Sequence, residues 1–132
     1  MAEEGLITTA SAHSFGGTVS RLEAALQDKG MTIFARVDHA AGAAAVNLSL
    51  RPTTLLVFGN PKGGTPLMLV AQKIGVELPL KILVWEDESG KTWLTYDDPA
   101  WLAQRFGVDP TLAAVAALSA AMAAFADLAG RA

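Results

Sequence analysis

The sequence predicts an α+β fold with a single sheet of about five strands, mainly antiparallel, and several helices. Three observations lead to this prediction. The 132 residues are 52% hydrophobic and 17% charged, which suits one domain with one core. Short apolar, β-branched runs alternate with segments of helical periodicity. A hairpin pattern late in the chain argues against a purely parallel sheet. Read in sequence, the strand and helix patterns give the order β-α-β-α-β-α-β-β-α-α.

The first third of the chain predicts two strands, each followed by a helix. Residues 6–9 form a β-prone run. A helix then begins after Ser14, whose hydroxyl suits an N-cap, and ends at Gly30, a C-cap residue. Residues 32–37 alternate in character and predict the second strand. Residues 38–46 predict a short alanine-rich helix, capped by the aspartate that begins the segment.

The middle of the chain predicts a third strand, a glycine-rich turn and a third helix. The strand, residues 53–58, is β-branched and apolar, and the turn, residues 59–64, contains three glycines. Thr65 suits the N-cap of the helix and Pro66 suits its first position, where the missing N–H costs nothing. Gly75 is expected to end that helix.

The last third predicts a hairpin and two helices. Residues 80–86 and 92–96 form the two strands of the hairpin, around a turn at residues 88–90. Residues 98–106 predict a short helix that begins with Asp-Pro. The longest helix, rich in alanine, is expected to cover about residues 110–129.

The composition excludes several classes of function. The net charge is −3 and the ten Lys and Arg residues are scattered, so we expect no basic face for nucleic acid. The chain contains no cysteine, which excludes disulfides, thiolate catalysis, and cysteine-bound zinc or iron–sulfur clusters. Its two histidines, His13 and His39, fit no metal-ligand spacing. We therefore expect neither a metal nor a cofactor.

Domain organisation and location follow from the distribution of residues along the chain. No linker or repeat divides residues 1–132, which are expected to form a single domain. The acidic N-terminus is followed by no apolar signal core, so a cytoplasmic location is expected. The longest uncharged apolar run, residues 111–126, is shorter than the roughly 20 residues that span a bilayer. We therefore expect no membrane span.

Several strings of residues resemble the domain-of-unknown-function 302 family. They are Val37-Asp38-His39, the run from Leu50 to Pro61 (LRPTTLLVFGNP), Gly64-Thr65-Pro66-Leu67-Met68 and Leu78-Pro79-Leu80-Lys81, continued by Glu86, Gly90 and Tyr96-Asp97-Asp98-Pro99. The likeness covers about residues 5–107, so the helix at 110–129 is an addition to that core or a variable end of it. The resemblance implies an antiparallel sheet with helices on one side, like half of the TATA-binding-protein-like fold. It implies no reaction, because the family has no agreed activity.

The segment from Asn60 to Thr65 is the strongest candidate for a ligand site. Gly63 and Gly64 can bring backbone N–H groups close to a ligand, and the N-terminus of the following helix adds positive dipole character. Lys62 supplies a full charge. This combination predicts a site for a small anion, such as a carboxylate or phosphate, with Asn60 beside it. The alternative is a turn whose glycines serve backbone geometry alone.

His39 and Lys81 are two further candidates for the same site. His39 would lie in the first turn of its helix, where the dipole favours the neutral imidazole, so it could act as an acid–base group or contact a ligand. The alternative is a structural histidine bonded to a backbone carbonyl. Lys81 shares a strand face with apolar residues and could meet an anionic ligand. It could equally be an edge-strand lysine that discourages aggregation.

The last predicted helix is apolar on nearly all sides. One stripe carries large side chains and the other faces are mostly alanine; the stripe contains Leu112, Val115, Leu118, Met122 and Phe125. A domain of this size covers only one side of such a helix, so we expect a homodimer through it, unless the alanine side faces solvent.

Three functions remain open from the residues alone. The first is a binding or sensory module for a small molecule, an anion included. The second is a structural or interaction subunit, and the third is an enzyme of unidentified class that uses His39 as acid–base. No nucleophile–base pair or cofactor fingerprint favours the enzyme.

Overall fold

Alternation of side chains along the strands gives the sheet two unlike faces. The computed structural model describes residues 3–132 and contains an antiparallel five-stranded sheet in the order β1-β5-β4-β3-β2. The strands are β1 (Leu6–Ala10), β2 (Thr32–Asp38), β3 (Thr53–Gly59), β4 (Leu80–Glu86) and β5 (Thr92–Asp97). The predicted fold class is confirmed.

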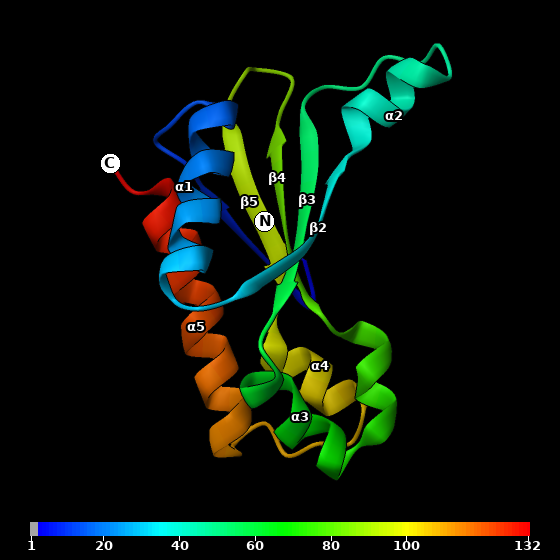
Figure 1. Cartoon of the computed structure of the whole chain (residues 1–132), viewed down its shortest axis with the longest axis vertical. Coiled ribbons are helices and arrows are strands. Elements are labelled where there is room, and N and C mark those ends of the chain that lie inside the picture. The colour runs from blue at the N-terminus through cyan, green and yellow to red at the C-terminus, as the bar shows by residue number, and fades with distance from the viewer. Residues whose placement is uncertain (1–2) are drawn as a thin grey trace.

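The helices follow the predicted order, with a 3₁₀ helix added before β4 (Figure 1). They are α1 (Phe15–Asp28), α2 (His39–Ala45), α3 (Pro61–Val70), the 3₁₀ helix η1 (Gln72–Glu77), α4 (Pro99–Arg105) and α5 (Ala113–Gly130). Strands β2 and β3 form a ribbon with two ends. We call the end where Thr32 pairs with Gly59 the lower end, and the end where Asp38 pairs with Thr54 the upper end. Figure 1 shows α2 projecting from the upper end and α3 at the lower end.

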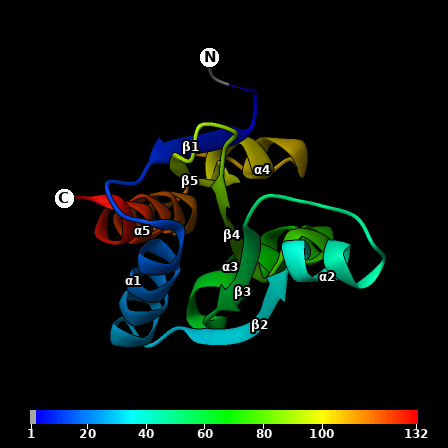
Figure 2. The ribbon, with the colours of Figure 1, turned by 90° about the horizontal axis from the view of Figure 1, so that it is seen from above.

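One face of the sheet is covered by α1 and α5, which lie together on the same side of it (Figure 2). The helical periodicity of both helices turns large side chains toward the strands. Phe58 of β3 meets Phe125 of α5 edge to face, with ring centroids 5.8 Å apart. The principal members of this core are Leu22, Leu26, Leu56, Phe58, Ile82, Val84, Leu94, Met122 and Phe125.

A second group of buried side chains lies at the lower end, where α3, η1 and α4 meet the first half of α5. Its members are Leu67, Ile74, Ala103, Val108, Val115 and Leu118. Among residues 3–132, α5 is the one helix that is long and apolar enough to cross a bilayer by length and composition. Its large side chains are buried in both clusters, so we assign it to the core of the fold.

The start of α3 differs from the prediction. The helix begins at Pro61 rather than after Thr65, because Oδ1 of Asn60 accepts a hydrogen bond from Lys62 N at 2.9 Å and Pro61 fits the first helical position. The segment predicted as a turn is therefore the first turn of α3. Pro66, predicted to start the helix, lies inside it.

Two further boundaries differ for local reasons. One helix was predicted to continue to Gly75, but the extended backbone of Ala71 (φ −143°, ψ 92°) separates α3 from η1. The last helix begins at Ala113 rather than near residue 110. Asp109 instead caps a separate turn, in which its Oδ1 accepts from Thr111 N at 2.9 Å.

The opposite face of the sheet is left open by α1 and α5. We call it the open face, and its side chains are mostly half-buried by one another. It contains Leu6, Thr8, Ala35, Val37, Thr53, Leu55, Val57, Lys81, Leu83, Trp85, Trp93, Thr95 and Asp97, which the strand register places on the same side.

Candidate functional site

A cavity of about 390 Å³ lies at the lower end of the β2–β3 ribbon. Its walls come from the lower ends of both strands, the first turns of α3, the segment from η1 into β4, and one residue of α5. The large apolar side chains in its lining are Met31, Phe34, Met68, Leu78, Leu80 and Leu118, with Pro61 and Pro79. The polar side chains in the described lining are those of Asn60 and Thr65. The site is therefore mainly apolar.

Glycines in the lining keep this space free. A Cβ atom at Gly64 would lie 3.3 Å from Cδ1 of Leu78, and one at Gly75 would lie 3.1 Å from Sδ of Met68. An added methyl group would therefore occupy part of the cavity. Gly63 and Gly64 both lie inside α3, where glycine costs roughly 0.5–1 kcal/mol relative to alanine. The free volume is thus obtained with residues that weaken the helix.

The N–H groups at the start of α3 are occupied by Asn60. Its Oδ1 accepts from Lys62 N, and its carbonyl oxygen accepts from Gly63 N at 2.9 Å and Gly64 N at 3.3 Å. Lys62 is exposed and lies outside the lining of the cavity. The free N–H groups expected after Gly64 do not occur there, because the helix starts earlier than predicted. The cavity accordingly suits an apolar body better than a bare anion.

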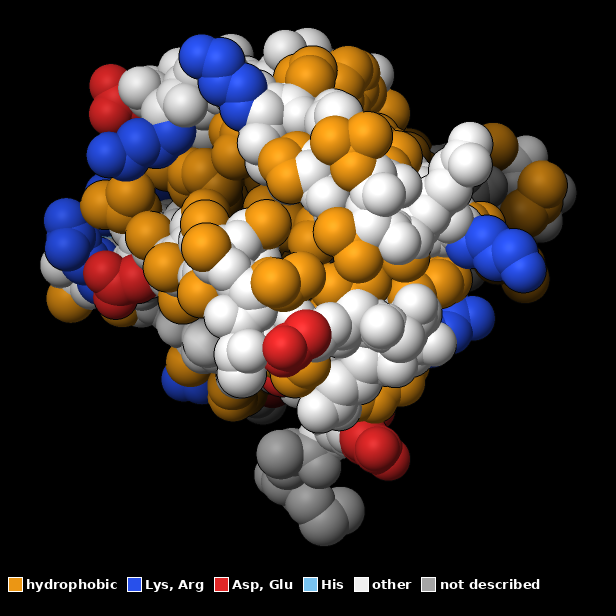
Figure 3. Space-filling model, turned by 90° about the horizontal axis from the view of Figure 1, so that it is seen from below, with side chains coloured by type: hydrophobic (Ala, Val, Ile, Leu, Met, Phe, Trp, Pro, Cys, Tyr) orange, Lys and Arg blue, Asp and Glu red, His pale blue; other side chains and the backbone are white. Residues whose placement is uncertain are grey.

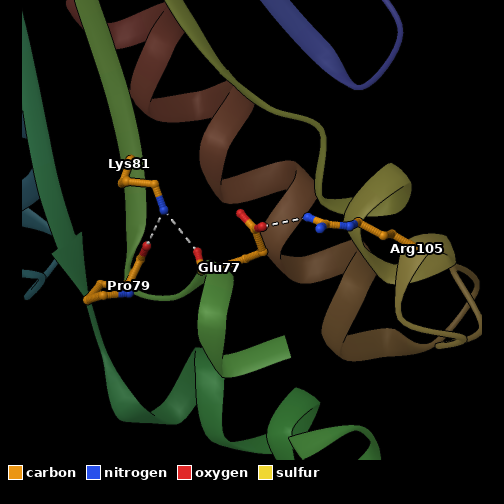
Figure 4. Close-up of polar contacts among 4 residues, drawn as sticks. All are labelled: Glu77, Pro79, Lys81 and Arg105. Atoms are coloured by element: carbon orange, nitrogen blue, oxygen red, sulfur yellow. Dashed lines mark hydrogen bonds and ion pairs between the residues drawn. The ribbon is translucent and has the colours of Figure 1, made fainter. Parts of the chain in front are cut away.

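Lys81 lies on the opposite face of β4 from Leu80, which lines the cavity, because successive strand residues alternate. Its Nζ donates to the carbonyl oxygens of Glu77 at 3.1 Å and Pro79 at 3.3 Å (Figure 4). The Glu77 carboxylate in turn pairs with Arg105, with 2.6 Å between Oε1 and Nη1. Lys81 thereby ties η1 to β4.

Asp97 adds a second carboxyl group to this charged cluster. Burial raises the pKa of Asp97 above its ordinary value, and the negative charge of Glu77 raises it further. Lys81 and Arg105 act on the same pKa in the opposite direction. The charges at the lower end are therefore largely compensated by one another.

His39 lies at the other end of the ribbon from the cavity. Asp38 is the last residue of β2 and pairs with Thr54, whereas Thr32 pairs with Gly59 beside the cavity. The intervening strand is seven residues long, or roughly 20 Å. The structure thus brings Asn60, Gly63, Gly64 and Thr65 together and leaves His39, Lys62 and Lys81 outside the cavity.

His13 has a position of its own near the C-terminus. Its Nε2 lies 2.7 Å from the carbonyl oxygen of Arg131, which links the start of α1 to the end of α5. Within residues 3–132, no group of three His, Cys, Asp or Glu side chains is placed to hold a metal ion.

Sequence reasoning missed the apolar residues of the cavity. Phe34 lies at a β-bulge, where the register shifts between Ile33 and Ala35, and it is 58% exposed. Strand alternation alone does not reveal such a shift. A usable signal did exist, because the strings that carried the family resemblance, 50–61, 64–68 and 78–81, contribute most of the cavity wall.

The surface at the lower end is rich in hydrophobic side chains. Seen from below, they occupy much of the centre of the molecule, and most charged side chains lie toward the rim (Figure 3). Leu69, Val70 and Val76 are 82%, 60% and 76% exposed. The elements α3 and η1 therefore build both the cavity and an exposed apolar surface.

Comparison with curated proteins gives partial matches. The fluoride-specific ion channel FluC 1 of Brucella suis biovar 1 (strain 1330) is 52% identical over 103 residues, which are 78% of this chain and 41% of that protein. The fluoride-specific ion channel FluC 2 of Brucella melitensis biotype 1 matches with the same identity and length, over 38% of its own sequence. The chain thus spans about two fifths of the length of these relatives.

Comparisons of sequence family and of fold agree with each other. The profile of the family described as domain of unknown function DUF302 matches residues 7–126, which include most of α5. A crystal structure of an uncharacterized conserved DUF302 protein from Bacillus stearothermophilus has a TM-score of 0.85 and 22% sequence identity, covering 96% of this chain and 99% of that chain. Identity this low supports the fold alone. On the family match, the chain belongs to the DUF302 family.

Proposed function

We propose that this DUF302 protein is a binding or sensory module for a small, mainly apolar molecule, held in the cavity at the lower end of the β2–β3 ribbon. The observation that carries the proposal is the cavity itself. Its volume of about 390 Å³ lies within the roughly 300–1,000 Å³ of ligand pockets. Such pockets are typically apolar with a few polar groups, as this one is.

The polar groups of the lining restrict the chemistry of the ligand. Oδ1 of Asn60 is used by the backbone of α3, so its amide NH₂ group is the part left to donate. The hydroxyl of Thr65 can also donate. Both groups suit a single hydroxyl, carbonyl or carboxylate oxygen on an apolar body. A carboxylate at that end would retain the anionic ligand predicted from the sequence, with Lys62 near the rim.

Calorimetric titration with four probes tests the proposal: hexanol, hexanoate, indole and inorganic phosphate. We expect saturable binding of the three apolar probes, accompanied by a rise in Tm, because a ligand of the native state stabilises it. Phosphate should not bind. If the carboxylate of hexanoate lies near Lys62, Lys62→Ala should weaken the binding of hexanoate and leave the binding of the other probes unchanged. If none of the three apolar probes binds saturably at millimolar concentration, or if phosphate alone binds, the proposal is wrong.

A matched pair of glycine variants locates the binding site. Gly64→Ala places a methyl group in the cavity, whereas Gly42→Ala places one on α2, where no atom lies within 4 Å of the new Cβ. Both changes put alanine inside a helix, which favours folding. At Gly64 the Leu78 side chain must also shift by a few tenths of an ångström, so the free energy of unfolding of both variants is measured alongside binding. We expect Gly64→Ala to weaken probe binding by about tenfold, or about 1.4 kcal/mol, and Gly42→Ala to leave it unchanged. Equal binding by both variants would place the probe outside the cavity.

The names of the relatives support a second candidate function. A chain 52% identical to part of proteins named fluoride-specific ion channels could serve as a sensory module that responds to fluoride. Titration with sodium fluoride against sodium chloride in the same calorimeter tests it. Saturable heat with fluoride alone would favour this second function, and identical traces for the two salts would remove it.

A further inference from the structure

The segment at the upper end packs only slightly against the rest of residues 3–132: α2 contacts β3, but none of its residues is buried. We define the arm as residues 39–50, which comprise α2 and the chain that follows it. α2 contains no buried residue, and Val46, Leu48 and Leu50 are 64%, 66% and 47% exposed. In Figure 1 the arm projects away from the rest of the molecule. Isolated helices shorter than about 12–15 residues are marginal in water, so a seven-residue helix of this kind requires a surface to pack against.

The arm also lacks the charge of a solvated surface. Its twelve residues, HAAGAAAVNLSL, include no Asp, Glu, Lys or Arg. Depletion of charge together with exposed aliphatic side chains is typical of the central part of a protein interface. The arm therefore has the chemistry of a buried segment.

The strand residues in the upper half of the open face are uncharged, but two charged groups of the β4–β5 turn reach it. Nζ of Lys91 lies 5.3 Å from the centroid of the Trp93 ring, and the Asp87 carboxylate accepts from Trp93 Nε1. The charged members of that face, Lys81 and Asp97, lie at its lower end. In the upper half, Trp85 and Trp93 stack with ring centroids 6.2 Å apart. Val37, which is 38% exposed, belongs to the open face and comes two residues before the arm, so the two regions form one continuous surface.

The tryptophans of this face already have partners for their indole N–H groups. Nε1 of Trp85 donates to Oγ1 of Thr95, and Nε1 of Trp93 donates to Oδ2 of Asp87, both at 2.8 Å. The donation from Trp93 also holds the pKa of Asp87 well below its ordinary value. Covering the two rings would leave no indole donor unpaired. Because Asp87 and Lys91 contact Trp93, these two charged groups must stay at the solvated rim of any such interface.

We propose that the arm and the upper half of the open face form a homodimer interface, in which the arm of each protomer covers the open face of the other. Two-fold symmetry satisfies both surfaces at once, because each copy offers one arm and one face. Together they amount to about 20 residues a side, at the lower limit of the roughly 20–30 of a standard interface. The proposal is independent of the cavity and its ligand.

This arrangement moves the dimer predicted from the sequence to another surface. That prediction placed the contact on the last helix, but the large side chains of α5 are buried in the core of its own chain. Its outward side consists mainly of alanines. Exposed aliphatic side chains lie on the arm, as they also do on α3 and η1 at the lower end.

Sedimentation and light scattering between 1 and 100 μM (on the order of the micromolar affinities of ordinary complexes) test the interface. Leu48→Asp in the arm and Val37→Lys on the open face should each raise the dimer dissociation constant at least tenfold, with circular dichroism unchanged. The control is Leu69→Asp on α3, which replaces a side chain of greater exposure and should have no effect. A monomeric wild type at every concentration, or a dimer broken only by Leu69→Asp, would overturn the proposal.

Tryptophan fluorescence provides a second readout that does not depend on hydrodynamics. Two of the three tryptophans, Trp85 and Trp93, lie on the open face. Acrylamide quenching should therefore increase when the wild type is diluted, and should be high at all concentrations in Leu48→Asp. If sedimentation shows that the dimer dissociates on dilution but acrylamide quenching does not change, the interface lies elsewhere. If the wild type is a monomer that binds phosphatidylcholine vesicles and Leu48→Asp does not bind them, the arm contacts a lipid surface and the dimer proposal is wrong.

Discussion

The two ends of the β2–β3 ribbon each carry a short helix with few charged residues, and only the helix at the lower end is packed into the core. At the lower end, a helix rich in glycine and aliphatic residues packs against η1 and α5 and encloses a cavity. At the upper end, a helix rich in alanine and glycine stands exposed with no buried residue. The lower end receives α5 from elsewhere in the chain. The comparison teaches that burial of a short apolar helix depends on what the rest of the chain brings beside it.

The largest difference between the two ends should appear in core truncations. Leu67→Ala removes a side chain that is 4% exposed and should cost roughly 2–5 kcal/mol of unfolding free energy. Leu48→Ala removes one that is 66% exposed and should cost no more than about 0.5 kcal/mol at low micromolar concentration. Urea denaturation measures both. Equal losses in monomeric protein would mean that the arm packs on its own chain.

Removal of the two helix caps should sharpen the same contrast. Asn60→Ala and Asp38→Ala each delete an N-cap side chain, and caps typically contribute about 1 kcal/mol. Because α3 is part of the core, Asn60→Ala should lower the global free energy of unfolding by about that amount. Asp38→Ala should leave the global midpoint of dilute protein unchanged and abolish amide protection in α2 alone. Hydrogen exchange combined with urea unfolding distinguishes these outcomes, and a global loss in Asp38→Ala would contradict the comparison.

The smallest expected effect is the pH dependence that Asp97 contributes at the lower end. The raised pKa of Asp97 means that its contribution to stability is fully present below the ordinary value of 3.8 and is lost as pH rises through the folded-state pKa. Asp97→Asn should therefore be more stable than the wild type at pH 7, and the difference should disappear below pH 4. Thermal unfolding across that range measures it. An Asp97→Asn variant that is less stable than the wild type at pH 7, with a deficit that shrinks as pH falls, would show that the attraction of Lys81 and Arg105 outweighs the burial of Asp97.

Local features of the fold were predictable because they depend on neighbouring residues. Ser14 caps α1 by accepting from Gly17 N, and Gly30 follows that helix with a φ of 73°, as a left-handed C-cap residue requires. Alternation identified β3 and the hairpin of β4 and β5 within a residue of their observed ends. Of the segment from Asn60 to Thr65 that the sequence proposed as a ligand site, Asn60, Gly63, Gly64 and Thr65 line the cavity and Lys62 does not, and the helix starts earlier than predicted.

The sequence by itself determined the strands and most of the caps, since short-range periodicity and hydrogen bonding encode these. That helices cover one side of the sheet was implied by the family resemblance. Tertiary structure alone decided that Phe34 and Leu118 face the same cavity, that His39 lies a strand length away from it, and that the arm is left uncovered. Hydrophobic attraction is non-directional. It specifies that apolar residues will be buried, whereas the path of the chain selects which of them meet.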